Sequence, residues 1–283
     1  MALEFQIAST KIASSRIELV DGVAVPVQSK DWMTIVVTPI LFNGQIQPVE
    51  GRCTGTLVGP GVILLAAHCL DQGAANGSLR PAFLKVDGER VPLICAIFPT
   101  YLGSPYSPTA PRRSEDFGMC HASLAGPHPI IAAMKYEMLD LTPAAAGQPV
   151  LMTGYGCTDI DKPEAMDATL RIGDAAIGYA AGNLGPAGDY ATISSLSDDE
   201  PSLCPGDSGG PLFSGATVKS PQGQRRVRGV NSSYANVLPA RFSKVAMLSL
   251  SGFSEWVIQW LRNFPDAYVC GISDPAVAPS CHG

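Results

Sequence analysis

The segment Cys204-Pro205-Gly206-Asp207-Ser208-Gly209-Gly210-Pro211 holds one serine between glycines, with an acidic residue before it and a proline after it. Glycine lets the backbone turn tightly and lets its N–H groups approach a ligand closely. A serine in such a loop is a candidate nucleophile, but its hydroxyl needs a neighbouring base to react at neutral pH. The histidines of the chain are therefore the candidates for that base.

His68 is the best candidate for that base. It lies in Ala66-Ala67-His68-Cys69, at the end of an apolar run and next to a cysteine. An imidazole that takes the serine proton is what acyl transfer by serine requires. Comparable settings are lacking for the other histidines, which are His121, His128 and His282.

Asp116 is the best candidate for the group that orients the histidine. It precedes a predicted strand over residues 117–122, whose apolar residues can bury the carboxylate. The backbone N–H groups of Gly206 and Ser208 are the candidate donors to the negative charge that develops on a substrate carbonyl. The chain thus offers a nucleophile, a base, an orienting acid and an oxyanion hole.

The composition predicts a globular protein built mostly of strands. Of 283 residues, 46% are hydrophobic, and 29 glycines with 24 prolines suit short strands joined by turns. The net charge of −6 argues against a nucleic-acid partner, and no apolar run is long enough to span a membrane. One helix is predicted from an apolar stripe at helical spacing, made by Phe253, Trp256, Val257, Trp260 and Leu261.

The cysteine pattern bears on the compartment and on metal binding. The chain has eight cysteines without a CxxC pair, which favours disulfides in an oxidising compartment over a zinc site. Free buried thiols in a cytoplasmic enzyme are the alternative. The cysteines therefore favour a secreted or periplasmic protein. No signal peptide is visible, so either a leader was removed or the protein is not secreted, and a cytoplasmic location stays open. We expect no metal and no cofactor.

These segments resemble the trypsin and chymotrypsin family of serine proteases. AAHC, the D-F-G-M segment and GDSGGP stand in the family's order, and the similarity extends to Cys53-Thr54-Gly55-Thr56-Leu57 and Gly154-Tyr155-Gly156. It covers roughly residues 19–264. The resemblance implies an all-β fold of two six-stranded antiparallel β-barrels, with the active site between them and a C-terminal α-helix.

The resemblance also implies a division of the chain. Residues 1–18 would be an N-terminal extension and a candidate propeptide. Residues 19–135 would form the first barrel with the histidine and the aspartate. Residues 136–264 would form the second barrel with the serine, the oxyanion hole and the helix, and residues 265–283 would form a tail.

Asp207 matches the acid that pairs with a new N-terminus after zymogen cleavage in the family. The register of Val20-Asp21-Gly22 would place Leu19 at that terminus, whereas the bond that looks cleavable is Arg16–Ile17. Activation by cleavage is therefore a hypothesis, with its site left open.

Four disulfides are expected from the resemblance. Cys53–Cys69 matches a family disulfide beside the histidine. The usual partner of Cys204 is missing, and Cys157 lies close to that loop in relatives, which suggests Cys157–Cys204. The two remaining pairs would join neighbouring strands of the first barrel and staple the tail, as Cys95–Cys120 and Cys270–Cys281.

The residues that match the primary pocket carry no charge. Ser202 matches its floor, Ala240 another base position, and Leu203 and Tyr234 its walls. A buried Lys or Arg side chain would lack an ionic partner there, which is costly. We therefore expect apolar P1 residues, small or medium rather than large aromatic ones.

The segment Ser232-Ser233-Tyr234 matches the part of the family that pairs with the substrate backbone. The Ser232 hydroxyl would also support Asp116. The implied function is that of a serine endopeptidase working through an acyl-enzyme intermediate. Its partners would be a protein or peptide substrate and a protein inhibitor, and the chain would be a monomer.

Two other functions fit parts of the sequence. Residues 206–210 also match G-x-S-x-G, the nucleophile elbow of α/β-hydrolases, but Gly209-Gly210-Pro211 resists the helix that must follow, and only His282 comes after the serine. A protease homologue that only binds partners is the stronger alternative. Such proteins usually lack a member of the triad, whereas all three candidates are present here.

Overall fold

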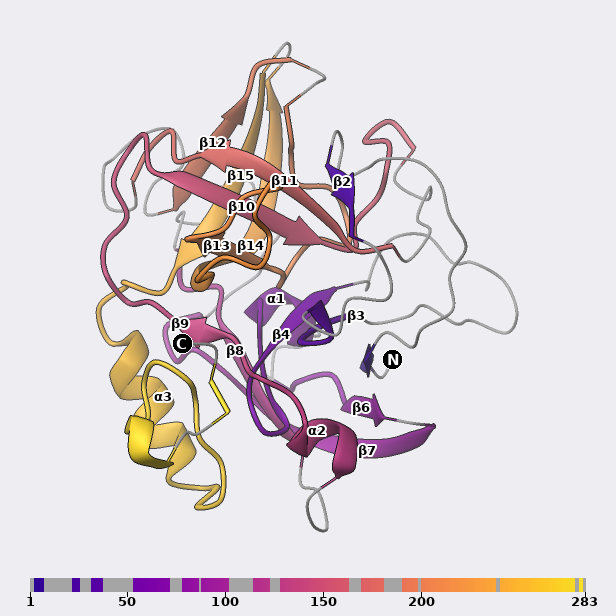
Figure 1. Cartoon of the computed structure of the whole chain (residues 1–283), viewed down its shortest axis with the longest axis vertical. Helices are drawn as coiled ribbons and strands as arrows, with labels where there is room; N and C mark the ends of the chain where they lie inside the picture. Colours follow the sequence, from indigo (N-terminus) through magenta and orange to yellow (C-terminus); the bar gives the residue numbers. More distant parts are fainter. Residues whose placement is uncertain are drawn as a thin grey trace.

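The computed structural model describes residues 3–7, 22–25, 32–37, 53–71, 78–86, 88–101, 114–122, 128–162, 169–180, 190–197, 200–237, 240–277 and 280–281. Its strands form two barrel-like sheets, one above the other in Figure 1. Within the described residues, no helix is both long and apolar enough to cross a membrane.

The first sheet closes into a barrel of seven strands. Hydrogen bonds link them in the order β1-β3-β4-β5-β8-β7-β6 and back to β1. Alternating burial in β6 and full burial of β4 and β5 are the patterns of strands that line a core. The strands are β1 (Leu3–Ile7), β3 (Ile35–Val37), β4 (Thr54–Gly59), β5 (Val62–Leu65), β6 (Ala82–Val86), β7 (Glu89–Ile97) and β8 (Gly118–Ala122).

The second sheet has eight strands, in the order β12-β15-β14-β13-β10-β11-β2, with β9 paired to β14 off this path. A smaller apolar cluster lies within it and includes Val150, Met152 and Val245. The strands are β2 (Val23–Ala24), β9 (Met138–Leu139), β10 (Pro149–Gly154), β11 (Arg171–Ala176), β12 (Ala191–Ser195), β13 (Pro211–Ser214), β14 (Arg226–Val237) and β15 (Ala240–Met247).

The two-barrel all-β fold with a C-terminal helix is confirmed, but the described residues place seven strands in the first sheet and eight in the second, where six were expected in each barrel. The extra strand of the first barrel is β1, from the segment expected to be a separate extension. Gln6 pairs with Val37 on one side, and Leu3–Gln6 run parallel to Ala82–Lys85 on the other. Phe5 is fully buried and Leu3 nearly so, because strand residues with alternating apolar side chains fill the barrel interior.

Two more segments cross the expected boundaries between the barrels. β2 falls in the range 19–135 assigned to the first barrel, yet it pairs with β11 of the second sheet. The helix α3 (Phe253–Leu261) was assigned to the second barrel, yet its buried face packs on the first. Its Phe253 ring lies 4.8 Å from that of Phe117, and its Trp256 ring lies 5.3 Å from that of Phe98.

The residues after α3 also fasten to the first half of the chain. The Cys270 N–H donates to the Val58 carbonyl, and the Tyr136 N–H donates to the Ser280 carbonyl. The short 3-10 helix η2 (Pro275–Val277) lies between Cys270 and Cys281. The tail and α3 together cover the outside of the first barrel (Figure 1).

All four expected cysteine pairs are disulfide-bonded in the structure. They are Cys53–Cys69, Cys95–Cys120, Cys157–Cys204 and Cys270–Cys281, and the described residues contain no free cysteine. Cys95 and Cys120 are direct partners in the register of β7 and β8, which explains how sequence-distant cysteines meet. Disulfides of this number fit an oxidising compartment.

Candidate active site

His68 and Asp116 are brought together by the pairing of two strands of the first barrel. Leu65 ends β5, and it pairs with Gly118, which begins β8. The chain leaves β5 into the short helix α1 (Ala67–Leu70), which carries His68, while Asp116 lies just before β8. In Figure 1, α1 lies at the junction of the two sheets. The pair therefore lies at the edge of the first barrel that faces the second.

The Asp116 carboxylate is held by three hydrogen bonds. Its Oδ1 accepts from the His68 backbone N–H at 2.9 Å, and its Oδ2 accepts from His68 Nδ1 at 2.7 Å. The Ser232 hydroxyl, on β14 of the second sheet, donates to the same Oδ2 at 2.5 Å. The aspartate is only 2% exposed, so these donors replace the water that the carboxylate lacks.

The pKa values of this pair move in opposite directions. Burial alone would raise the pKa of Asp116, but the charge of His68 and the hydrogen bonds from His68 and Ser232 outweigh it and lower that pKa. Burial alone would lower the pKa of His68, but the Asp116 charge and hydrogen bond outweigh it and raise that pKa above its usual value. The aspartate thus stays ionised, and His68 becomes a stronger base than a free imidazole.

The loop that carries Ser208 is anchored on the first barrel. The Thr54 hydroxyl donates to the Gly206 carbonyl, and the Thr54 N–H donates to the Ser208 carbonyl, both at 2.8 Å. These bonds join β4 to a loop more than a hundred residues later in the chain. In the sequence, Thr54 stands out only as part of a motif, because no local pattern indicates a contact of such long range.

The Ser208 hydroxyl does not bond to His68 in this structure. It donates instead to the Ser232 carbonyl at 3.2 Å, from a partly buried position. The expected serine–histidine hydrogen bond is therefore absent among the described residues, while the histidine–aspartate bond is present.

The two expected oxyanion donors are unengaged. Among the described residues, neither the Gly206 N–H nor the Ser208 N–H donates a hydrogen bond, although the carbonyls of both residues accept one. Gly206 has a φ of 102°, a conformation that side chains rarely tolerate. Two free N–H groups beside the candidate nucleophile form a site for negative charge.

Asp207 belongs to the same loop, and its side chain is fully buried. Its carboxylate accepts hydrogen bonds from the N–H groups of Gly156 at 2.7 Å and Cys204 at 2.9 Å. A Cβ on Gly154 would lie 2.1 Å from the Asp207 Oδ1, which explains why glycine is required there. The segment that would supply the expected new N-terminus, with Ile17 and Leu19, lies outside the described residues.

The residues expected at the primary pocket differ in exposure. Ser202 and Leu203 are buried, and the Leu203 N–H donates to the Ser243 hydroxyl at 2.9 Å. Tyr234 and Ser233 are exposed and Ala240 is partly exposed. Among the described residues, the Ser202 hydroxyl has no hydrogen-bond partner. The other residues expected to bind substrate also carry no charge; they are Leu203, Ser233, Tyr234 and Ala240.

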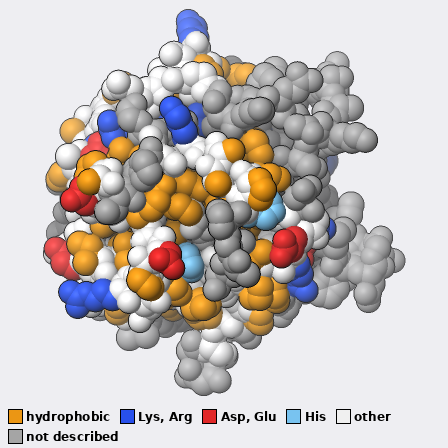
Figure 2. Space-filling view, turned by 60° about the horizontal axis from the view of Figure 1, so that its bottom comes forward, with side chains coloured by type: hydrophobic (Ala, Val, Ile, Leu, Met, Phe, Trp, Pro, Cys, Tyr) orange, Lys and Arg blue, Asp and Glu red, His pale blue; other side chains and the backbone are white. Residues whose placement is uncertain are grey.

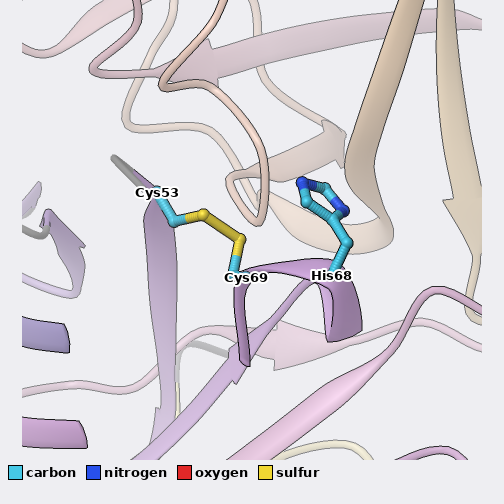
Figure 3. A group of neighbouring side chains, drawn as sticks. All are labelled: Cys53, His68 and Cys69. Atoms are coloured by element: carbon cyan, nitrogen blue, oxygen red, sulfur yellow. A yellow bond between two sulfur atoms is a disulfide. The ribbon is translucent and has the colours of Figure 1, made fainter. Parts of the chain in front are cut away.

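The cluster of Cys53, His68 and Cys69 has ligand atoms close enough together to suggest a metal site. Figure 3 shows that the two sulfurs are joined as a disulfide and that the His68 ring points away from them. Disulfide sulfur is no thiolate ligand, and the Nδ1 of His68 is already bonded to Asp116. The cluster therefore does not fit a metal ion.

One face of the molecule shows how the charged side chains of the described residues are distributed. In Figure 2, basic and acidic side chains lie in small groups among hydrophobic and uncharged ones, over the described part of that face.

Comparisons with known proteins show what this chain is similar to. The sequence model of the family described as Trypsin matches residues 40–248. No curated protein matches the chain. A solved structure of neuropsin, "a serine protease expressed in the limbic system of mouse brain", is similar with 18% identity and a TM-score of 0.51, covering 74% of this chain and 88% of that one.

A second solved structure, of a Glu endopeptidase in complex with MPD, has 14% identity and a TM-score of 0.49, covering 80% of this chain and 89% of that one. At these identities the likeness to neuropsin concerns the fold.

Proposed function

Since the chain belongs to the trypsin family of serine proteases, we propose that it is an endopeptidase in which Ser208, His68 and Asp116 form the catalytic triad. The single observation that carries the proposal is the buried Asp116 carboxylate, bonded at once to His68 Nδ1 and to the Ser232 hydroxyl. This arrangement fixes the tautomer of His68 so that its other nitrogen, Nε2, is free to accept a proton.

The proposed reaction begins when the Ser208 hydroxyl turns from the Ser232 carbonyl toward His68. The Ser208 Oγ attacks the substrate carbonyl carbon while His68 Nε2 takes its proton. The negative charge on the carbonyl oxygen is met by the N–H groups of Gly206 and Ser208. His68 then gives its proton to the departing amine, and water releases the acyl group from Ser208 in the reverse sequence.

The proposed preference is for substrates with small or medium apolar P1 residues. It is supported by the uncharged set Ser202, Leu203, Tyr234 and Ala240, since a cationic side chain would find no carboxylate partner among them. A panel of chromogenic peptides that differ only at P1 tests this point. Fastest turnover of the arginine peptide would contradict the preference and leave the proposed reaction intact.

Activation by cleavage and secretion complete the proposal. A new N-terminus near residues 17–19 would pair with Asp207, and the four disulfides support an oxidising compartment. N-terminal sequencing of active protein tests the cleavage. Activity of a chain that still carries Met1–Ser15 would contradict it.

The deciding experiment is labelling with a fluorophosphonate probe, which reacts only with an activated serine. We expect the wild-type protein to label, Ser208→Ala to lose the label, and Ser254→Ala, at a partly exposed serine of α3, to keep it. A wild-type protein that is folded but unlabelled after N-terminal processing would favour the alternative, a protease homologue that acts by binding.

A further inference from the structure

Tyr190 lies beside the residues of the candidate triad but comes from a different part of the chain. It directly precedes β12 in the second sheet and is partly buried against the main apolar core. Its hydroxyl lies 3.3 Å from the Ser232 Oγ. No motif in the sequence surrounds it, so only the fold reveals this position.

The chemistry of the three groups fixes the direction of the hydrogen bonds. An ionised carboxylate can only accept, so the Ser232 proton must go to the Asp116 Oδ2, 2.5 Å away. The Ser232 oxygen then has only lone pairs left for Tyr190. The tyrosine hydroxyl must therefore donate to Ser232, and a chain of donors runs from Tyr190 through Ser232 to Asp116.

The environment keeps Tyr190 in its donor form. Burial raises the pKa of the Tyr190 hydroxyl, and the negative charge of Asp116 raises it further. Loss of its proton would place a second negative charge near Asp116, which the site resists. The hydroxyl stays protonated throughout the pH range in which a serine protease is assayed.

We propose that Tyr190 is a positioning residue that acts on the His68–Asp116 pair through Ser232. This inference rests on the function proposed above. A hydroxyl that receives a hydrogen bond becomes a stronger donor itself, so Tyr190 strengthens the bond from Ser232 to Asp116. That bond holds the carboxylate in place and draws negative charge away from the side that faces His68.

Removing the Tyr190 hydroxyl has a definite consequence for His68. With a weaker bond from Ser232, more of the Asp116 charge acts on the imidazole, and the pKa of His68 rises. The other charged groups near these residues are Asp71 and Arg80 beside His68 and Glu115 beside Tyr190, and the substitution leaves them unchanged. The acid limb of kcat/KM therefore moves to higher pH.

The test is Tyr190→Phe, alone and combined with Ser232→Ala. We expect kcat to fall about fivefold, the effect of losing one neutral hydrogen bond, with KM changed less than about twofold. In the Ser232→Ala background, the same tyrosine substitution has almost no further effect on kcat. The matched control is Tyr136→Phe, a buried tyrosine whose hydroxyl donates to the Ile131 carbonyl away from the site, and it leaves the pH profile unchanged.

An NMR titration of His68 in wild type and Tyr190→Phe gives a second readout that needs no turnover. A higher His68 pKa in the variant supports the proposal, and an unchanged one overturns it. Equal losses of kcat in both Ser232 backgrounds, or a loss confined to KM, also overturn it. A wild-type protein that neither labels nor hydrolyses would instead contradict the proposed function, and thermal melting shows whether each variant is folded.

Discussion

The two sides of the candidate site treat their polar groups in opposite ways. On the first barrel, the buried Asp116 carboxylate accepts three hydrogen bonds. On the second, the N–H groups of Gly206 and Ser208 have no acceptor among the described residues, although the carbonyls of the same residues are bonded to Thr54. One side stabilises a charge that is present in the resting protein. In the function proposed above, the other would stabilise the charge that develops on the substrate carbonyl.

The largest expected effect comes from removing the negative charge of Asp116. Asp116→Asn keeps the size of the side chain but removes the charge, and its amide can hold His68 in the wrong tautomer. We expect kcat to fall about 10⁴-fold with little loss of fold. Steady-state kinetics on an apolar P1 peptide measures it. A loss below about tenfold would mean that the charge of Asp116 is not needed.

Phe5→Ala tests whether the first barrel depends on β1 for its integrity. The ring is fully buried, and its truncation is expected to cost about 3–5 kcal/mol of the free energy of unfolding. Denaturant unfolding followed by fluorescence measures the change. The matched control is Gln6→Ala in the same strand, whose partly exposed side chain should cost far less. Equal small effects would show that β1 contributes little.

Gly206→Ala alters the loop that carries Ser208 and leaves the His68–Asp116 pair unchanged. The φ of 102° is strained for alanine, so the loop should shift and displace the N–H groups. We expect kcat to fall about 10²- to 10³-fold, comparable with the loss of one oxyanion donor, while the pKa of His68 is unchanged. A shifted pKa of His68 in this variant would show that a change in the serine loop also alters the His68–Asp116 pair.

The smallest effect is the dependence of the wild-type enzyme on pH. The base must be neutral, and the Asp116 charge and hydrogen bond raise the pKa of His68 above its usual value of 6.5 despite burial. We therefore expect kcat/KM to fall about tenfold per pH unit below a midpoint that lies above 6.5. A midpoint below 6.5 would mean that burial outweighs Asp116.

The same raised pKa has a consequence for stability with the opposite pH dependence. A group whose pKa is higher in the folded state stabilises that state at pH values below its unfolded pKa, and this contribution is lost as the pH rises through the folded value. The contribution of His68 therefore fades in the range where its activity as a base appears. Asp116, with its lowered pKa, loses its contribution only as the pH falls through that low value.

Through its resemblance to the trypsin family, the sequence predicted the fold class and the cysteine pairs. It also predicted that His68 and Asp116 meet, because each lies in a short distinctive segment. It did not predict β1, since an alternation of apolar residues over Leu3–Ile7 is too short to identify a strand without its neighbours β3 and β6. The sequence also gave no sign of the contacts of Tyr190 and Thr54, because both contacts join distant strands and leave no local pattern.

The pairing of β1 changes what a cut at Arg16–Ile17 would produce. Residues 1–16 contain no cysteine, so no disulfide from these residues would tether them after the cut. They would remain as a separate peptide held by the ladders with β3 and β6, by buried Leu3 and Phe5, and by the ion pair between Glu4 and Arg90. The cleaved molecule would then be a complex of two pieces that are held together without a covalent bond.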